Sequence, residues 1–150
     1  MAVATDERRA ADLWAYREEH TPAINTLGPP HKLDVTLPPA VLARFVDEVP
    51  AVVRAIDPTA HTWLFGHVGD GNVHVNISGL AAPDGDADDA VLRFVAGLGG
   101  SISAEHGIGT AKKPWLHLNR SPVELDVFRA VKQALDPAGI LNPNCLLPDA

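Results

Sequence analysis

The sequence has few of the residues on which several classes of protein depend. Its 150 residues contain a single cysteine, Cys145, so a framework of intrachain disulfides is excluded. No stretch approaches the roughly 20 apolar residues of a membrane-spanning helix, and the first residues lack the apolar run of a secretory signal peptide. We therefore expect a chain without membrane spans that resides in the cytoplasm, where thiols stay reduced.

Basic residues are also few, and the common phosphate-binding motifs are absent. Lysine and arginine together number 12 against 19 acidic residues, which gives a net charge of −7. This balance excludes a broad basic surface for nucleic acid or anionic lipid. The sequence also contains no Gly-x-Gly-x-x-Gly run after a strand and no P-loop, the two common cradles for nucleotide phosphates. What the sequence does have is a hydrophobic content of 46%, enough for the core of one domain.

The apolar patterns along the chain predict an α+β fold. Helical periodicity predicts helices over 6–19, 38–57, 86–98 and 122–135, and alternation predicts strands over 31–37, 61–67, 72–78 and 101–105. The central order of strand, helix, strand, strand, helix, strand is the split βαβ, or ferredoxin-like, arrangement. We therefore expect an antiparallel sheet with helices on one face, an open second face, and additional helices at both termini.

The helix predicted over 38–57 has a clear apolar stripe and an internal proline. Its expected buried stripe consists of Leu42, Phe45, Val46, Val49, Val53 and Ile56. Pro50 lies inside this stripe and removes one intrahelical hydrogen bond, so we expect a kink or a short break there.

The residues around the Asp70-Gly71 pair form the most informative stretch. This pair between alternating apolar residues favours a type I′ turn, which needs positive φ at both central positions. With these two as the whole loop, His67 would lie directly opposite His74, their Cβ atoms roughly 4.5–5.5 Å apart. Asn76 would share that face. Two interpretations stay open at this point: a pair of solvated histidines, or two ligands of one metal ion.

Glu105, at the end of the last predicted strand, adds a carboxylate to the two imidazoles. Two histidines and one carboxylate with an open position are typical of a catalytic site for a divalent metal. We expect zinc, although manganese and iron also bind such ligands. The adjacent His106 could act as a general base. Arg17 and Lys32 would bind a substrate carboxylate if they reach the same face. The chemistry indicated is removal of a proton from a hydroxyl held on a metal.

Three motifs in order also resemble one family of enzymes. The motifs span residues 66–74, 103–109 and 135–143, and the similarity extends from about Leu13 to Pro148. Together they resemble the C-terminal domain of the FAD-linked oxidases, relatives of D-lactate dehydrogenase, glycolate oxidase and D-2-hydroxyglutarate dehydrogenase within the vanillyl-alcohol oxidase superfamily. The resemblance implies that residues 1–150 form one such domain, and that the N-terminal FAD-binding domain is absent from them.

The resemblance also implies a role for individual residues. His67, His74 and Glu105 match metal ligands, and His106 matches the catalytic base. The positions that match substrate contacts are Arg17, Thr21, Lys32 and Asn76, and Asn142 matches a cofactor contact.

The implied activity is the FAD-dependent oxidation of a D-2-hydroxy acid, of the lactate, glycolate or 2-hydroxyglutarate type, to a 2-oxo acid. The implied partners are that small hydroxy acid and a separate FAD-binding chain, which would hold most of the flavin. An alternative from another class is a non-catalytic module that binds a metal or a carboxylate, or a truncated remnant of the enzyme.

Overall fold

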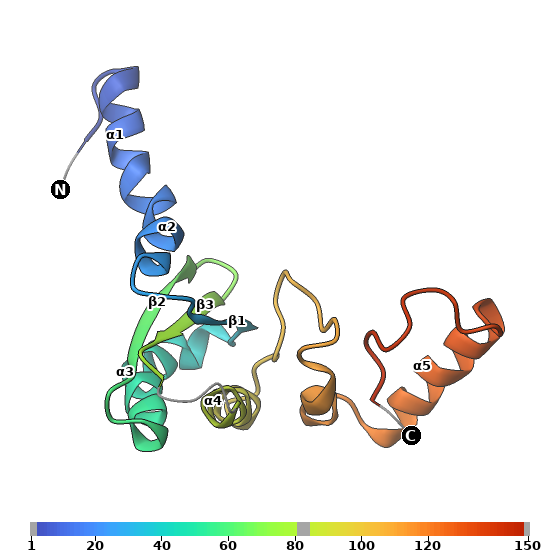
Figure 1. The fold of residues 1–150 in the computed structure, drawn as a ribbon. Helices are drawn as coiled ribbons and strands as arrows, with labels where there is room; N and C mark the ends of the chain where they lie inside the picture. Colours follow the sequence, from blue (N-terminus) through green and yellow to red (C-terminus); the bar gives the residue numbers. More distant parts are fainter. Residues whose placement is uncertain (1–2, 81–84, 149–150) are drawn as a thin grey trace.

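The computed structural model describes residues 3–80 and 85–148. Its elements in chain order are α1 (Glu7–Glu18), α2 (His20–Asn25), β1 (His31–Thr36), α3 (Pro39–Ile56), β2 (His61–His67), β3 (Asn72–Ser78), α4 (Asp86–Gly97), the 3₁₀ helix η1 (Lys113–Leu118) and α5 (Pro122–Leu135) (Figure 1). This mixture of helices with an antiparallel sheet confirms the expected α+β class. Among the described helices, none combines the length and the apolar character that a bilayer crossing requires.

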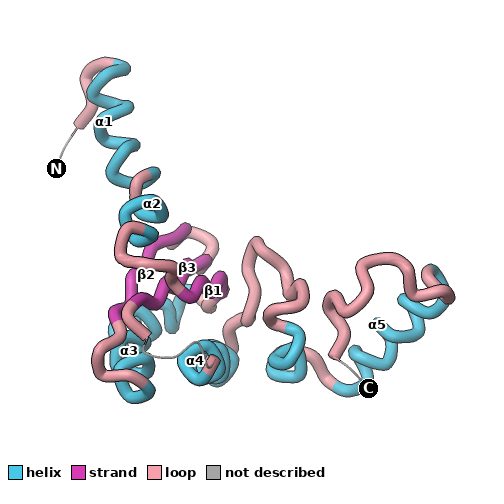
Figure 2. The backbone as a smooth tube through the Cα atoms, viewed as in Figure 1, coloured by secondary structure: helices cyan, strands magenta, loops and turns pink. Residues whose placement is uncertain are grey.

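The centre of the fold is a three-stranded sheet with helices on one face. β3 lies between β1 and β2 and runs antiparallel to both (Figure 2). Alternation along β1 and β3 turns one apolar set, including Val35 and Val75, toward α3 and α4. There these side chains pack with residues such as Phe45 and Val91, which are fully buried. The second face carries the polar residues of the same strands.

Helix α3 runs without a break through Pro50, so the short break expected there is wrong, and the kink stays a prediction. Its buried residues are Leu42, Phe45, Val49 and Val53. Val46 and Ile56, expected in the same stripe, are 39% and 44% exposed. Val46 follows Phe45 directly and is therefore rotated from it by about 100° around the helix axis. Ile56 is the last residue of the helix, so both residues lie at the margin of the core.

The register of the β2–β3 hairpin differs from the expected one. Four residues, 68–71, join the strands instead of two, so His67 pairs with Asn72 and Phe65 pairs with His74. The shift amounts to two residues, and a shift by an even number keeps every side chain on its face. The two histidines therefore share one face as expected, but they lie diagonally and not directly opposite.

A contact outside the hairpin accounts for the longer loop. The carbonyl of Gly71 accepts a hydrogen bond from the backbone N–H of Leu37, just after β1, at 2.9 Å. Gly71 has a φ of +76°, and a Cβ atom there would stand 2.1 Å from the Leu37 carbonyl oxygen. The end of the turn is thus fixed by its packing against β1, which local turn preferences do not report.

The strand expected at 101–105 is reduced to a single bridge between Ser101 and the end of β1. Side chains bind the backbone N–H groups that would have continued the ladder. Asn119 accepts the N–H of Ile102 at 2.7 Å, and the carboxylate of Asp34 accepts the N–H groups of the residues that follow Ser103. The segment therefore continues as a loop over the polar face of the sheet.

The terminal helices extend away from the sheet on different sides (Figure 1). Helix α1 has no buried residue, and α5 buries only Leu125. Helix α5 begins with a capping box, in which Ser121 and Glu124 exchange hydrogen bonds. Phe128 is partly buried, and four other apolar residues of α5 are more than half exposed: Val123, Val127, Val131 and Leu135. Both helices present apolar side chains that the described part of the chain does not cover.

Candidate functional site

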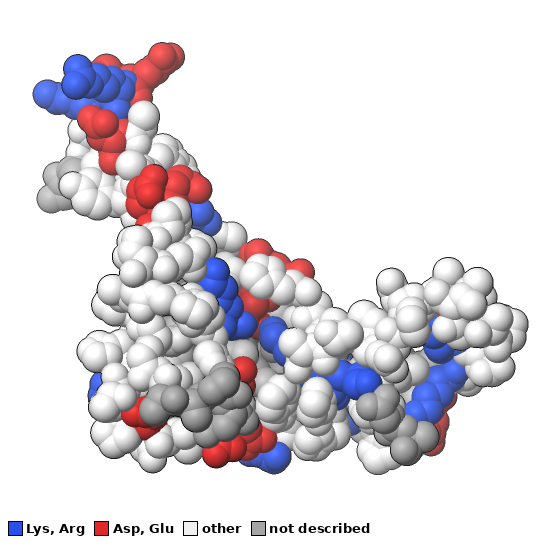
Figure 3. Space-filling view, in the orientation of Figure 1, with Lys and Arg blue, Asp and Glu red and all other residues white. Residues whose placement is uncertain are grey.

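A cleft of about 320 Å³ opens on the face of the sheet that α3 and α4 leave free. Its lining residues are Arg17, Thr21, Lys32, Leu33, Phe65, His74, Asn76, Glu105 and His106. They come from α1, α2, the three strands and the loop after Ser101. The space-filling view shows basic and acidic side chains meeting in the hollow between the N-terminal helices and the C-terminal arm (Figure 3). All the predicted site residues except His67 and Asn142 line this cleft.

The register of β1 and β3 accounts for the floor of the cleft. Lys32 pairs with Asn76, and Asp34 pairs with His74, so all four side chains belong to one face. Asn76 is buried, whereas Lys32 is exposed. An amide thus lies at the base of the cleft with an ammonium group beside it.

His67 stands at the rim, between α1 and the loop. Its Nδ1 atom lies 3.3 Å from Oε1 of Glu105, and its Nε2 atom lies 3.0 Å from Nη2 of Arg17. Metal–ligand bonds of about 2.0–2.2 Å at a tetrahedral angle separate two ligand atoms by roughly 3.3–3.6 Å. The spacing between His67 and Glu105 fits two ligands of one ion, and it equally fits an ion pair.

Three imidazoles come together around His74. The His74 ring stacks on that of His106 with centroids 5.6 Å apart, and it meets the His67 ring edge-on at 6.4 Å. Nδ1 of His74 lies 3.4 Å from Oδ1 of Asp34, which leaves Nε2 for a ligand. On its other side, the His74 ring contacts Phe65, whose centroid is 5.1 Å away.

Asp34 is a buried residue beside the cleft that sequence reasoning did not identify. It is 1% exposed, and its Oδ2 atom accepts the backbone N–H groups of Ala104, Glu105 and His106 at 3.2, 2.7 and 2.8 Å. Its Oδ1 atom accepts a hydrogen bond from the amide of Asn72 at 3.1 Å. Burial raises the pKa of Asp34, but these hydrogen bonds outweigh it and hold the pKa below its ordinary value of 3.8.

Lys112 is a second buried charge beside the cleft. Its ammonium group donates to the backbone carbonyl of Asp34 at 2.7 Å, and burial lowers the pKa of Lys112. A signal for Asp34 existed in the sequence, because it shares the polar face of a half-buried strand with Lys32. Its partners lie about 70 residues further along the chain, so periodicity alone could not identify them.

A different set of potential metal ligands overlaps the predicted one. Asp34, His74 and His106 each offer a ligand atom, and these atoms lie within 4.8 Å of one another. Both carboxylate oxygens of Asp34, however, already accept hydrogen bonds from the protein. His67, His74 and Glu105 do not form such a group among the described residues, although Glu105 is exposed and its Oε1 atom lies 3.3 Å from Nδ1 of His67.

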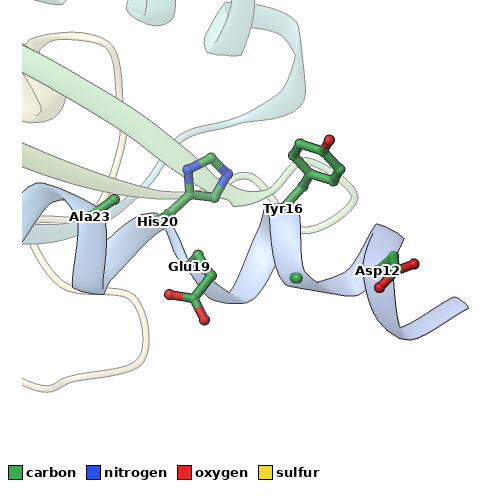
Figure 4. A pocket seen from close by; sticks show the side chains of 6 residues that line it. Asp12, Tyr16, Glu19, His20 and Ala23 are labelled. Atoms are coloured by element: carbon green, nitrogen blue, oxygen red, sulfur yellow. The ribbon is translucent and has the colours of Figure 1, made fainter. Parts of the chain in front are cut away.

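A larger hollow, of about 640 Å³, lies along α1 and α2 (Figure 4). Tyr16 and His20 point to the same side of these helices, whereas Glu19 points away from them in this view. The His20 ring also stacks on Phe65, at 5.2 Å. This hollow lies beside the cleft and shares none of its lining residues, so we place the chemistry in the cleft.

Asn142, the predicted cofactor contact, lies elsewhere. It is exposed in the tail after α5, with a φ of +43°. The tail approaches the loop of the site through Leu146, whose N–H donates to the carbonyl of Gly109 at 2.9 Å.

Comparison with known proteins identifies the family to which the chain is similar. Residues 1–146 match the family described as FAD linked oxidases, C-terminal domain. The mitochondrial D-2-hydroxyglutarate dehydrogenase of Bos taurus is 41% identical over 150 residues, which cover 97% of this chain and 27% of that protein. The D-2-hydroxyglutarate dehydrogenase of Stutzerimonas stutzeri is 36% identical over 149 residues, covering 94% of this chain and 32% of that protein.

A relative named for a different activity matches over the same region. The D-2-hydroxyglutarate–pyruvate transhydrogenase of Saccharomyces cerevisiae is 34% identical over 151 residues, covering 94% of this chain and 30% of that protein. The chain thus spans about a quarter to a third of the length of the curated relatives it matches. The match of a C-terminal domain over nearly all of these residues leads to one conclusion: the chain belongs to the FAD-linked oxidase family.

Proposed function

We propose that this chain binds a D-2-hydroxy acid and removes its hydroxyl proton, as the substrate-binding part of an FAD-dependent dehydrogenase. The observation that carries the proposal is the cleft, in which two cations, an amide and an imidazole from distant segments face one space. The names of the relatives favour a 2-hydroxyglutarate-type substrate over lactate or glycolate. The product would be the corresponding 2-oxo acid.

Substrate binding would rest on charge. Arg17 and Lys32 enter the cleft from α1 and β1, so a diacid could place one carboxylate on each cation. Arginine can hold a carboxylate through two parallel hydrogen bonds, whereas lysine acts as a point charge. Thr21 and Asn76 add hydrogen-bonding groups that could orient the substrate between the two cations.

A divalent metal, zinc first, would be held by His67, His74 and Glu105. The 3.3 Å between Nδ1 of His67 and Oε1 of Glu105 supports two of these ligands. His74 would add its Nε2 atom as the third, since its Nδ1 atom lies beside Asp34. When bound, such an ion lowers the pKa of a coordinated hydroxyl group.

His106 would accept the hydroxyl proton at an imidazole nitrogen. Its ring stacks on His74 and its side chain is exposed, so the proton can pass on to water. FAD, when bound, would supply the acceptor for the hydride that leaves the carbon carrying this hydroxyl group. Loss of one proton and one hydride converts the alcohol to a carbonyl, and the charges balance.

The flavin would be held mainly by an FAD-binding partner that these 150 residues do not include. This expectation is supported by the family, in which the matched region is a C-terminal domain, and by the uncovered apolar residues of α1 and α5.

Metal binding and ligand binding to the purified chain test the proposal. Zinc would be titrated into the chain and into the variant His67→Ala, with His61→Ala as the matched control, since His61 lies on the same face of the same strand. D-2-Hydroxyglutarate, D-lactate and glycolate would then be titrated into the zinc-loaded chain. We expect zinc binding that His67→Ala weakens and His61→Ala does not, and a preference for the diacid. Equal zinc affinity in both variants would refute the ligand assignment.

A measurement of turnover distinguishes the proposed enzymatic function from that of a non-catalytic binding module. Dye reduction by each acid would be measured for the chain mixed with the FAD-loaded N-terminal portion of a relative such as the Stutzerimonas stutzeri enzyme. Turnover that His106→Gln abolishes would support the proposed role. Binding of metal and acid without turnover in any such mixture would favour the non-catalytic module.

A further inference from the structure

We propose that Asp34 is the positioning residue of this site, which holds the loop of Glu105 and His106 in place and orients the ring of His74. The inference rests on the proposed function for the roles of those three residues. In this proposal Asp34 touches neither the substrate nor the metal. It contacts the residues that would bind them.

The loop is fixed at its beginning by the carboxylate. Three consecutive backbone N–H groups, from Ala104 to His106, converge on the single oxygen Oδ2 at 3.2, 2.7 and 2.8 Å. A carboxylate that is 1% exposed is costly without such partners, and hydrogen bonds to an ionised group are among the strongest in proteins. The segment therefore has one favoured placement although no strand ladder holds it.

The loop is fixed at its end by the backbone of the same residue. Lys112, which is 8% exposed, donates from its ammonium group to the carbonyl of Asp34 at 2.7 Å. Between these anchors lie Gly107 and Gly109, whose φ angles of +72° and +58° belong to the left-handed region. Both ends of a glycine-containing loop thus meet at one residue of β1.

The second carboxylate oxygen acts on His74. Oδ1 lies 3.4 Å from Nδ1 of that ring, and the amide of Asn72 donates to the same oxygen at 3.1 Å. A carboxylate beside Nδ1 favours a proton on that nitrogen and leaves the lone pair of Nε2 for a ligand. One aspartate would thereby set the nitrogen that His74 presents and the position of the base that stacks on it.

The hydrogen bonds themselves can be observed in the unmodified chain. We expect NMR couplings across the hydrogen bonds between the side-chain carboxyl carbon of Asp34 and the amide nitrogens of Glu105 and His106, with and without zinc. Absence of these couplings in the folded chain would overturn the proposal. Their loss on addition of zinc would also overturn it, because Asp34 would then be a metal ligand.

The consequences for the site are tested with Asp34→Asn, and exposed Asp47→Asn on α3 is the matched control for the lost charge. We expect Asp34→Asn to speed hydrogen exchange at the amides of Glu105 and His106 by at least about tenfold and to weaken zinc binding by about 10- to 100-fold. Asp47→Asn should change neither quantity by more than about twofold. A folded Asp34→Asn chain with both quantities unchanged would refute the proposal.

The outcome can be separated from that of the proposed function. If the unmodified chain binds no zinc, the proposed metal site fails, but the couplings and the amide exchange still decide the role of Asp34 in the loop. If Asp34→Asn does not fold, Lys112→Met provides the second variant. It should speed exchange toward the end of the loop while the couplings from Asp34 to Glu105 persist, and unchanged exchange throughout the loop would contradict the two-ended anchor.

Discussion

The two cations of the cleft are held in different ways, and this difference bears on their roles. The guanidinium of Arg17 contacts Glu18 at 3.0 Å and His67 at 3.0 Å, so its position depends on neighbouring side chains. Lys32 is the second residue of β1, opposite buried Asn76, and its backbone is fixed by the sheet. Lys32 is therefore the cation whose placement is set most firmly by the fold.

Replacing Lys32 tests the charge that the cleft offers to a carboxylate. We expect Lys32→Met to weaken the binding of D-2-hydroxyglutarate by about 10- to 100-fold, since a hydrogen bond to a charged group contributes roughly 1.5–3 kcal/mol. Calorimetric titration of the zinc-loaded chain measures the effect. Arg54→Met, at an exposed position of α3, removes the same charge away from the cleft and should leave the affinity unchanged. Equal affinities for the two variants would place the carboxylate elsewhere.

The lowered pKa of Asp34 predicts the pH dependence of stability. Because its pKa in the folded chain lies below the ordinary 3.8, the unfolded chain binds the proton more readily. The stabilisation by the carboxylate is therefore complete well above pH 3.8 and is lost as the pH falls through the folded pKa. Urea unfolding of the chain and of Asp34→Asn from about pH 6 to about pH 3 should show a stability difference that shrinks in acid. A difference that stays constant over this range would contradict the assignment.

At the scale of the elements, the hairpin depends on a close approach between Gly71 and β1. A Cβ atom at Gly71 would lie 2.1 Å from the Leu37 carbonyl oxygen, whereas one at Gly69 would meet nothing within 4 Å. We expect Gly71→Ala to lower the free energy of unfolding by about 1–3 kcal/mol, and Gly69→Ala to change it by less than about 0.5 kcal/mol. Urea denaturation provides both values. Similar losses for the two variants would mean that the loop is not packed as described.

The elements also show where sequence reasoning succeeds and where it stops. Alternation in β1 and β3 identified the polar face, because a strand has a side-chain period of two that a shift of two residues leaves unchanged. It could not fix the loop length, because Gly71 is held by Leu37 from another strand. It also predicted a strand at 101–105, where Asp34 and Asn119 bind the amides that a ladder would need.

The same limit applies to the candidate site. The pattern of histidines, cations and acids pointed to residues that the structure brings into one cleft, Lys32 and His106 among them. It did not identify Asp34 as an organising residue, because a lone acid on a strand is ordinarily a solvated one. Only its burial, and its distant hydrogen-bond partners, distinguish it.

At the scale of the whole molecule, the chain consists of a well-packed centre and two helical arms. Helix α3 buries four residues between 0% and 8% exposed, whereas α5 buries Leu125 alone. The large exposed apolar residues of α5 repeat every four positions, from Val123 through Val127 and Val131 to Leu135, and so form one apolar face. Such a face on a helix of 14 residues fits a surface that a partner covers.

Hydrogen exchange tests this division of the molecule. A helix of about 12–15 residues is marginal in water without tertiary packing, so the amides of α5 should exchange much faster in the chain alone than those of α3. Adding the FAD-loaded N-terminal portion of a relative should slow exchange in α5 and leave α3 unchanged, because α5 would gain a covering surface and α3 would not. Val127→Lys is expected to prevent this slowing, since Val127 is 54% exposed in the chain and would become buried in the complex. Exposed Arg129→Gln, on the same helix, serves as the control. Exchange in α5 as slow as in α3 before any partner is added would show that the arm is stable by itself and would remove the argument for a covering partner.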